Sequence, residues 1–417
     1  MGIARRRSGA VFGMACMAAA TCLTVLGGPP AGAAAGKSPI VIGYITSETG
    51  VASSNFSDGP GGAQARIDLQ NAHGGVNGHP LKLVVEDDQS GVSSNQTAAE
   101  DLVSNKKAMV VIQYSALGFG SARYLQQQGI PVVGSAFDGP EWGQQPYSNM
   151  FSWAAVSTPF NGVYYTSDGL GKFLHAIGVT KYAGLGYGIS PSSKDSIYAA
   201  MTSAAKYGIK QCYLNQSVPF GGSDFTADVL QIKSAGCNGV TGSFVDNSDL
   251  ALSGAVKQGG IAAKQVYFTG YDENILSTAA TRAAFEGSYA QSAVNFSPPG
   301  PAAKAMQATL KKYDPSYGGG IPDFGLFGSY ISADLAIKGL QLAGKNPTSA
   351  SFISHLRKLG SYNAGGILPS SVSFQHFGTV AMIPKTSCAY FEQLRGDHFV
   401  PYSGKAVCGK RISYNVP

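Results

Sequence analysis

Short apolar runs rich in β-branched residues alternate along the chain with amphipathic stretches of helical period. The first half of this pattern predicts strands at 40–45, 81–85, 108–113 and 130–133, separated by helices that begin near Pro60, Ser93 and Gly118. Strand–helix alternation with short loops is typical of a parallel sheet that helices cover on both faces. We therefore expect an α/β fold.

The same alternation starts again after residue 160 and predicts a second α/β unit. Helices are expected at 160–177, 196–207, 224–234 and 250–258, and strands at 182–187, 211–214, 240–244 and 265–268. After residue 295 the pattern changes, because the rest of the chain has too few strand-like runs to form a sheet of its own. The remaining expected elements are helices at 301–313 and 326–343, a strand at 380–384, and a hairpin of 389–393 with 398–402.

Three acids, Glu86, Asp87 and Asp88, come directly after the strand expected at 81–85. Open α/β sheets bind their ligands outside the carboxyl ends of the strands. We therefore expect these acids at the rim of a crevice rather than in a core, and we interpret Glu86 as a solvated charge.

Composition adds size and class to this picture. A chain of 417 residues is too long for one compact core, so two domains are expected. Hydrophobic residues make up 44% and charged residues 13%, which excludes a disordered chain and a coiled coil.

Residues 1–35 have the three-part layout of a secretory signal peptide. A basic start, Arg5 to Arg7, precedes an apolar stretch at 10–26, and Pro29 and Pro30 precede small residues suited to cleavage. Two alternatives stay open: a membrane anchor, and a lipid anchor on Cys22. The segment carries three arginines and no acid, so the formal charge of +6 falls to +3 on cleavage, too little to indicate nucleic-acid binding.

Export also decides how the cysteines are interpreted. Four remain after cleavage, an even number in an oxidising compartment, namely Cys212, Cys237, Cys388 and Cys408. Three pairings are possible, and the sequential one closes the shortest loops, each worth about 3 kcal/mol. Four buried thiols are the alternative. No Cys-x-x-Cys spacing supports a zinc site.

Four segments of the chain resemble a known family. They read IVIGYITSETG, GGAQARIDLQNAHGGVNGHPLKLVVEDD, VVIQYSA and GIPVVGSAF, and the later GGSDFTADVLQIKSAGCNGV is similar to the second lobe of the same family. The family comprises the extracytoplasmic solute receptors of ABC importers, in the branch of the leucine/isoleucine/valine-binding protein. The resemblance implies a type I periplasmic-binding fold, in which two doubly wound parallel-sheet lobes joined by three crossovers close on a ligand.

The resemblance also implies a domain plan. We expect the signal peptide at 1–35, lobe I at 38–155 and 286–368, and lobe II at 156–285 and 369–417. It further implies a small-molecule solute and a membrane ABC permease as partners, a monomer, and neither cofactor nor metal.

The same resemblance points to individual ligand-binding residues. Ser115, after the third strand, matches a family serine that grips the ligand carboxylate, and Asp272 matches an acid that pairs with the α-ammonium. A plain loop serine and a helix N-cap are the respective alternatives. Phe244 corresponds to an aromatic residue that packs on the ligand, and Tyr271 is a looser candidate. The loop after the fourth strand contributes Ala136, Phe137 and Asp138. The family tends to have small or hydroxyl residues there, so Phe137 and Asp138 depart from it. An acid at position 138 repels the carboxylate of an amino acid, unless its side chain points away or binds an amine.

The sequence therefore predicts an extracytoplasmic receptor for a small polar molecule, an amino acid or a related amide or amine. A ligand-sensing module for a signalling partner is one alternative. A secreted enzyme is the other, although the chain contains neither Gly-x-Ser-x-Gly nor His-Glu-x-x-His, and its six histidines are scattered.

Overall fold

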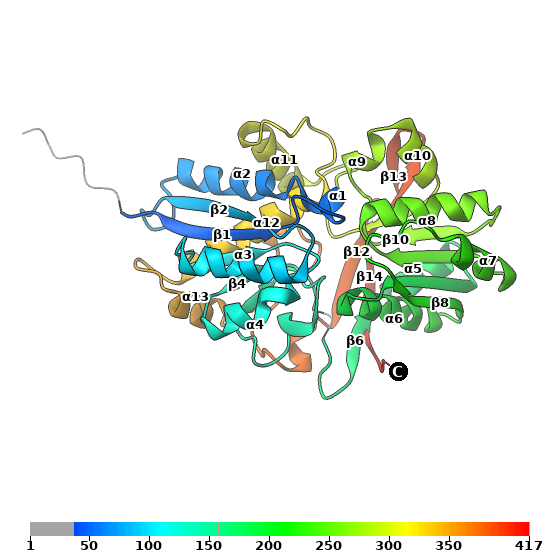
Figure 1. Ribbon diagram of the computed structural model, residues 1–417, viewed down its shortest axis with the longest axis horizontal. Coiled ribbons are helices and arrows are strands. Elements are labelled where there is room, and N and C mark those ends of the chain that lie inside the picture. The colour runs from blue at the N-terminus through cyan, green and yellow to red at the C-terminus, as the bar shows by residue number, and fades with distance from the viewer. Residues whose placement is uncertain (1–36, 157, 417) are drawn as a thin grey trace, which may run out of the picture. The chain divides into compact units, whose positions relative to one another are not determined.

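The structure, a computed structural model, describes residues 37–156 and 158–416, and the part from Lys37 onward is one compact unit (Figure 1). The predicted signal peptide and Cys22 lie outside the described residues. Among the residues that are described, no helix is long and apolar enough to cross a bilayer.

The first sheet has five strands, all parallel, in the order β2-β1-β3-β4-β5. These strands are β1 (Ile40–Thr46), β2 (Leu81–Asp87), β3 (Val110–Gln113), β4 (Val132–Gly134) and β5 (Met150–Ser152). Apolar side chains fill both faces, because Ile42 and Ile112 join one core and Ile45 and Val111 join the other.

Helices cover both faces of this sheet. One layer contains α2 (Gly59–Ala72) and α12 (Phe324–Leu342), and the other contains α3 (Val92–Ser104) and α4 (Phe119–Gln127). The shorter or peripheral helices are α1 (Ser53–Phe56), η1 (Pro140–Trp142), α11 (Pro301–Tyr313), α13 (Ser349–Leu356) and η2 (Ala364–Gly366).

The second sheet has nine strands, in the order β6-β14-β12-β11-β10-β9-β7-β8, with β13 paired to β12. Its strands from β8 to β11 are parallel, and the pairs that involve β12, β13, β14 and β6 are antiparallel. These strands are β6 (Tyr164–Ser167), β7 (Lys181–Tyr187), β8 (Lys210–Val218), β9 (Gly239–Ser243), β10 (Lys264–Tyr267), β11 (Tyr289–Ser292), β12 (Thr386–Arg395), β13 (His398–Pro401) and β14 (Val407–Tyr414).

The helices of the second sheet match the predicted pattern on its parallel part. They are α5 (Gly169–Ala176), α6 (Pro191–Ala205), α7 (Thr226–Ser234), α8 (Asp246–Gln258), α9 (Glu273–Leu276) and α10 (Ala279–Phe285), and η3 (Val380–Met382) precedes β12. Phe173 of α5 and Ile197 of α6 belong to one core, whereas Val229 of α7 and Leu252 of α8 belong to the core on the other face.

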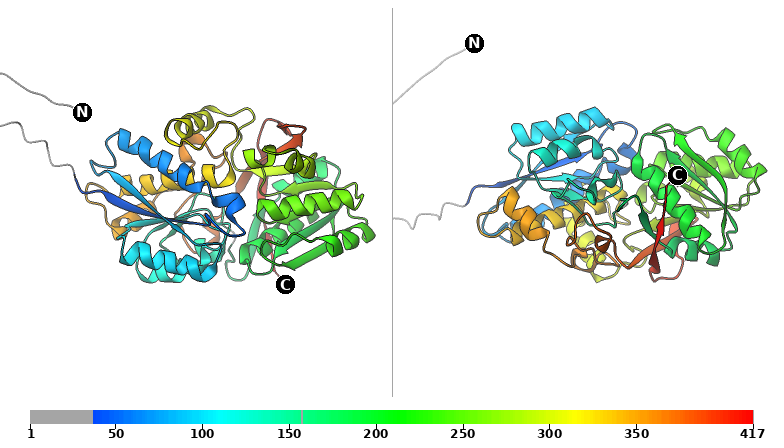
Figure 2. Two further views of the ribbon diagram at one scale, coloured as in Figure 1. Left: turned by 45° about the horizontal axis from the view of Figure 1, so that its top comes forward. Right: turned by 90° about the horizontal axis from the view of Figure 1, so that it is seen from below.

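The chain crosses three times between the two sheets. It passes from β5 to β6, returns after β11 to the helices α11 and α12, and crosses again before β12. Figure 2 shows the yellow helices beside the blue elements and the red strands beside the green ones, and α12 packs directly on α2. These are two doubly wound α/β units joined by three crossovers, so the predicted fold class is confirmed.

Two predicted elements are wrong. The helix expected at 160–177 begins only at Gly169, because Tyr164–Ser167 pairs antiparallel with β14. The strand expected at 380–384 is instead the 3₁₀ helix η3. The carbonyls of Val380 in η3 and of Ile383 just after it bond to a side chain rather than to a neighbouring strand, since the Arg411 guanidinium donates a 2.8 Å hydrogen bond to each.

The predicted boundary at residue 286 falls before β11, which pairs with β10 and β12 in the second sheet. Strand pairing therefore continues past that boundary to Ser292. The division into lobe I and lobe II stays a prediction.

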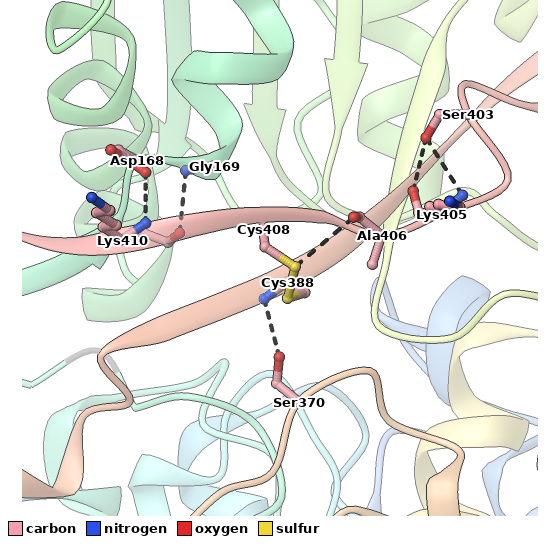
Figure 3. Close-up of a disulfide and its surroundings, with 10 residues drawn as sticks. Asp168, Gly169, Ser370, Cys388, Ser403, Lys405, Ala406, Cys408 and Lys410 are labelled. Atoms are coloured by element: carbon pink, nitrogen blue, oxygen red, sulfur yellow. Dashed lines mark hydrogen bonds between the residues drawn. A yellow bond between two sulfur atoms is a disulfide. The ribbon is translucent and has the colours of Figure 1, made fainter.

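Both disulfides have the sequential pairing. Cys212 is bonded to Cys237, and Cys388 to Cys408, with Cα atoms 5.9 and 4.0 Å apart. Cys388 and Cys408 are directly opposite residues on β12 and β14 (Figure 3). The Cys388 amide also donates a 3.2 Å hydrogen bond to the Ser370 hydroxyl, which ties the third crossover to the second sheet.

Candidate ligand-binding site

Each sheet reverses its strand order at one point, between β1 and β3 in the first and between β7 and β9 in the second. Loops at the carboxyl ends of strands on either side of such a point diverge and leave a crevice. Tyr187 ends β7 and Phe244 follows β9, while Ala116 and Phe137 follow β3 and β4 of the first sheet. All four side chains line the same cavity.

This cavity, the aromatic chamber, has a volume of about 340 Å³ and is lined by residues from both α/β units. None of its described lining residues is Asp, Glu, Lys, Arg or His. Ten of them are aromatic, namely Phe56, Phe137, Trp153, Tyr187, Phe220, Phe244, Phe268, Tyr271, Phe324 and Phe327.

The aromatic side chains form two walls. On the first-sheet side, the ring of Phe137 lies 5.6 Å from Phe56, stacked, and 5.6 Å from Phe324, between ring centroids. On the second-sheet side, the ring of Tyr187 lies 4.6 Å from Phe244 and 5.0 Å from Phe220. Rigid rings offer large contact area at little loss of side-chain freedom, so these walls are suited to an apolar or aromatic solute.

Hydroxyl groups supply most of the polar lining, and some already have partners. The Ser193 hydroxyl donates a 2.6 Å hydrogen bond to the Ser243 carbonyl and accepts a 2.8 Å bond from the Tyr187 amide. By contrast, within the described residues the hydroxyls of Ser135 and Ser196 and the side-chain carboxamide of Gln291 make no hydrogen bond. These groups are available to a ligand.

The seven predicted ligand-binding residues divide into two groups. Ala136, Phe137, Phe244 and Tyr271 line the chamber. Ser115, Asp138 and Asp272 are not among its lining residues, and all three are buried. The reason in each case is a partner inside the protein.

Ser115 belongs to a hydrogen-bond network around Asp88. The Ser115 hydroxyl donates to the Asp88 carboxylate, which also accepts a 2.6 Å bond from Ser47 and a 2.9 Å bond from Asn95. Asp88 is fully buried, so the prediction that it stands at a rim is wrong. A buried carboxylate requires donors, and Ser115 supplies one of them.

Asp138 accepts a hydrogen bond from the indole N–H of Trp142, inside the first unit. Burial, and next to it the nearby Glu141, raise the pKa of Asp138 well above its usual range, and burial raises the pKa of Glu141 to about 7. Two acids that share a buried site favour protonation of at least one of them. The departure from the family pattern therefore places no charge on the chamber wall.

Asp272 caps a helix. Its side chain accepts a 3.1 Å hydrogen bond from the amide of Ile275 at the start of α9. In the structure Asp272 therefore has the N-cap position, which was the alternative to a ligand-binding role. Burial, followed by repulsion from Asp246 and Asp323, raises the pKa of Asp272 well above its usual range.

Three buried acids nevertheless lie directly behind one end of the chamber. Asp272 follows the lining residue Tyr271, Asp246 follows the lining residue Val245, and Asp249 accepts a 3.0 Å hydrogen bond from the lining residue Thr269. Burial raises the pKa of Asp246, and burial and repulsion from Asp246 raise that of Asp249.

Sequence reasoning missed most of the lining, including Tyr187, Phe220 and Phe268, and it missed one contact between the two α/β units that nothing in the local sequence signals. Asn55, a lining residue on α1, accepts a 2.7 Å hydrogen bond from the amide of Asp246 at the start of α8. Its side-chain nitrogen is buried without a partner in the described part of the chain. Asn55 therefore acts as a helix cap provided by the opposite unit.

The described residues contain no group of three or more His, Cys, Asp or Glu side chains placed to hold a metal ion. The chamber thus presents aromatic faces, hydroxyls and the side-chain amides of Asn55 and Gln291, which are groups suited to binding a small molecule.

Comparisons with known proteins agree with the fold. The family model described as periplasmic binding protein matches residues 39–394. A comparison with curated protein sequences finds no match.

Three solved structures share the fold. A branched-chain amino acid ABC transporter protein from Thermus thermophilus with bound valine is 17% identical, has a TM-score of 0.71, and is aligned over 88% of this chain and 96% of its own. A solute-binding protein from R. palustris in complex with benzoate is 13% identical and has a TM-score of 0.70. It is aligned over 90% of this chain and 97% of its own. A fatty acid ABC transporter substrate-binding protein from Thermomonospora curvata is 16% identical and has a TM-score of 0.71. It is aligned over 89% of this chain and 92% of its own.

Proposed function

The chain belongs to the periplasmic binding protein family, and from this premise we propose that it captures an uncharged solute with an aromatic or branched apolar body and delivers it to an ABC permease. The observation that carries this proposal is the aromatic chamber, which both sheets line at the carboxyl ends of their strands and in which no described lining side chain is charged. An aromatic-walled cavity between two units is a binding site of the ordinary kind for small molecules.

The absence of charge from the described lining supports an uncharged solute over an anionic one. An anionic solute needs a cation or several N–H donors to replace its lost hydration, and no Lys, Arg or His is among those lining residues. A solute with hydroxyl or amide groups finds partners in Ser135, Ser196 and Gln291.

A second candidate keeps the expectation of an amine or amino-acid ligand. The three acids behind Thr269 and Tyr271 support it, because an ammonium group at that end of the chamber is attracted by any carboxylate that ionises. Asp246, Asp249 and Asp272 are those acids. In this candidate Ser115 has no direct role, since its hydroxyl is engaged by Asp88.

One screen tests both candidates. Thermal unfolding of the protein is followed with benzyl alcohol, benzamide, benzoate, benzylamine, phenylalanine and valine, each at millimolar concentration. A neutral aromatic member that raises the Tm more than its charged analogues supports the first candidate, because binding to the folded state raises stability by mass action. Preference for benzylamine or the amino acids supports the second. Turnover of a stabilising solute contradicts both and favours an enzyme.

A further inference from the structure

A second cavity adjoins the aromatic chamber and also has a volume of about 340 Å³. We name it the second chamber; its wall includes Thr166 of β6, Leu170 of α5, Ala199 of α6, Ser387 of β12 and Val407 of β14. Ala155, Ser196, Phe268 and Gln291 line both cavities. The two cavities therefore adjoin, and these four residues form a wall that they share.

The second chamber differs from the first in its chemistry. Phe268, Phe391 and Tyr165 are the aromatic residues of its described lining, and small side chains and hydroxyls make up most of the remainder. As in the first chamber, no described lining residue is Asp, Glu, Lys, Arg or His. One wall is cross-linked, because Cys388 of that wall is bonded to Cys408 across the β12–β14 pair (Figure 3).

Polar groups without partners run from one chamber into the other. Gln291 and Ser196 stand at the junction, and Thr166 and Ser387 lie in the second chamber. Within the described residues none of these four side chains makes a hydrogen bond, whereas the neighbouring Ser203 hydroxyl accepts a 2.8 Å bond from the Gly171 amide. Partially exposed hydroxyls and a carboxamide are both donors and acceptors, so they suit hydroxyl, ether or amide groups of a ligand.

We propose that the solute occupies both chambers: its aromatic or apolar end lies between Phe137 and Phe244, and an uncharged, hydroxylated extension passes Phe268 into the second chamber. This inference rests on the proposed function and adds the length and the chemistry of the solute. The two cavities together lie within the range of about 300–1,000 Å³ that is usual for small-molecule sites.

The test uses three probes with the same aromatic end. Benzyl alcohol carries no extension, and benzyl β-D-glucopyranoside carries an uncharged, hydroxylated sugar. Benzyl β-D-glucuronide carries a sugar of the same size and shape in which one hydroxymethyl group is replaced by a carboxylate. Binding of each to the full exported protein is measured by isothermal titration calorimetry. We expect the glucoside to bind at least tenfold more tightly than benzyl alcohol, and the glucuronide at least tenfold more weakly than the glucoside, because no cation is among the described lining residues of either chamber.

Two substitutions from different walls fill the second chamber. Ala199→Trp extends from α6 and Ser387→Phe from β12, so misfolding of one variant leaves the other as a test. Each is expected to abolish the advantage of the glucoside and to leave the affinity for benzyl alcohol within twofold. The matched control is Ala205→Trp, because Ala205 is an exposed residue at the end of the same helix; it should change neither affinity.

The outcomes separate the two proposals. If benzyl alcohol and the glucoside bind equally, or if the filled variants bind the glucoside as the unmodified protein does, the second chamber takes no part in binding and the inference is overturned while the proposed function stands. If no probe binds and only the charged solutes of the thermal screen do, the inference falls together with the first candidate function, the receptor for an uncharged solute.

Discussion

The amide nitrogen of Asp246 donates a 2.7 Å hydrogen bond to the side-chain oxygen of Asn55, although 191 residues separate the two along the chain. Asp246 is the first residue of α8 in the second unit, and α8 has no side-chain cap of its own. Asn55 lies on α1 beside the first sheet, where its side chain also lines the aromatic chamber. One side chain therefore links helix capping, the contact between the two units and the wall of the binding site.

Asn55→Ala should weaken binding of whichever solute stabilises the protein in the screen. The buried Asp246 amide loses its acceptor, which costs about 1 kcal/mol and corresponds to roughly a fivefold rise in Kd. Calorimetry measures the change. The control is Asn105→Ala, because the Asn105 side chain is exposed and bonds only to Asp101 on the same helix. Equal affinities of the two variants would mean that the contact plays no part in binding.

Phe137→Ala should reduce affinity more than it reduces stability. Its half-buried ring lies in the chamber and packs on Tyr114 at 4.9 Å and on Phe56 at 5.6 Å between centroids. Removing it withdraws a wall from an aromatic solute, and a loss of about 2 kcal/mol in binding is expected. Phe377→Ala is the matched control, since Phe377 is also half-buried but packs on Arg357 instead. If the Phe137→Ala and Phe377→Ala variants bind the solute with the same affinity, the solute does not lie against Phe137 in the chamber.

Removal of the Cys212–Cys237 bond should destabilise the protein by about 3 kcal/mol. The bond closes a loop of 25 residues, and its loss returns conformational freedom to the unfolded chain. Urea denaturation of a Cys212→Ala/Cys237→Ala variant measures the effect. Peptide mapping without reductant checks the pairing itself, and a peptide that joins Cys212 to Cys388 would show that the sequential pairing is not the one formed.

The stability of the protein should depend on pH through Glu392. Its side chain is buried on β12, one carboxylate oxygen has no partner within the described residues, and burial raises its pKa to about 8. Because the folded-state pKa is raised above the ordinary value of 4.5, this group's stabilising contribution is complete below about pH 4.5 and is lost as the pH rises through about 8.

Glu392→Gln removes the ionisation. We expect it to raise the free energy of unfolding at pH 9 by roughly 2 kcal/mol and to leave it nearly unchanged at pH 4.5. Chemical denaturation at both pH values gives the measurement, with Glu100→Gln on the exposed face of α3 as the control. A stabilisation that is the same at both pH values would show that the pKa of Glu392 is not raised in the folded state.

Buried carboxyl groups recur around the chamber, and hydrogen bonds inside the protein explain why three of the seven predicted residues, Ser115, Asp138 and Asp272, are not among its lining residues. Asp272 and Ser115 have the residue types and the places after strands that suit a ligand. In the folded chain, the Asp272 carboxylate accepts a hydrogen bond from the amide of Ile275, and the Ser115 hydroxyl donates one to the Asp88 carboxylate. A polar group that is buried takes the nearest available partner, and that partner is known only once the loops are in place.

Local pattern was sufficient for the elements whose stability is local. The run at 40–45 became β1, and the segment that begins near Pro60 became α2, because their side-chain periods match one buried face or both. The alternation of such elements then implied two doubly wound units.

Tertiary structure decided what depends on distant partners. Tyr164–Ser167 is a strand only because β14, more than 240 residues later, pairs with it, and Asn55 caps a helix that begins at Asp246. The sequence by itself determined most of the strands and helices and the two-unit architecture, since these depend on periodicities of a few residues. Only the folded chain decided which side chains face the chamber, because that depends on packing and hydrogen bonds between segments that no local pattern connects.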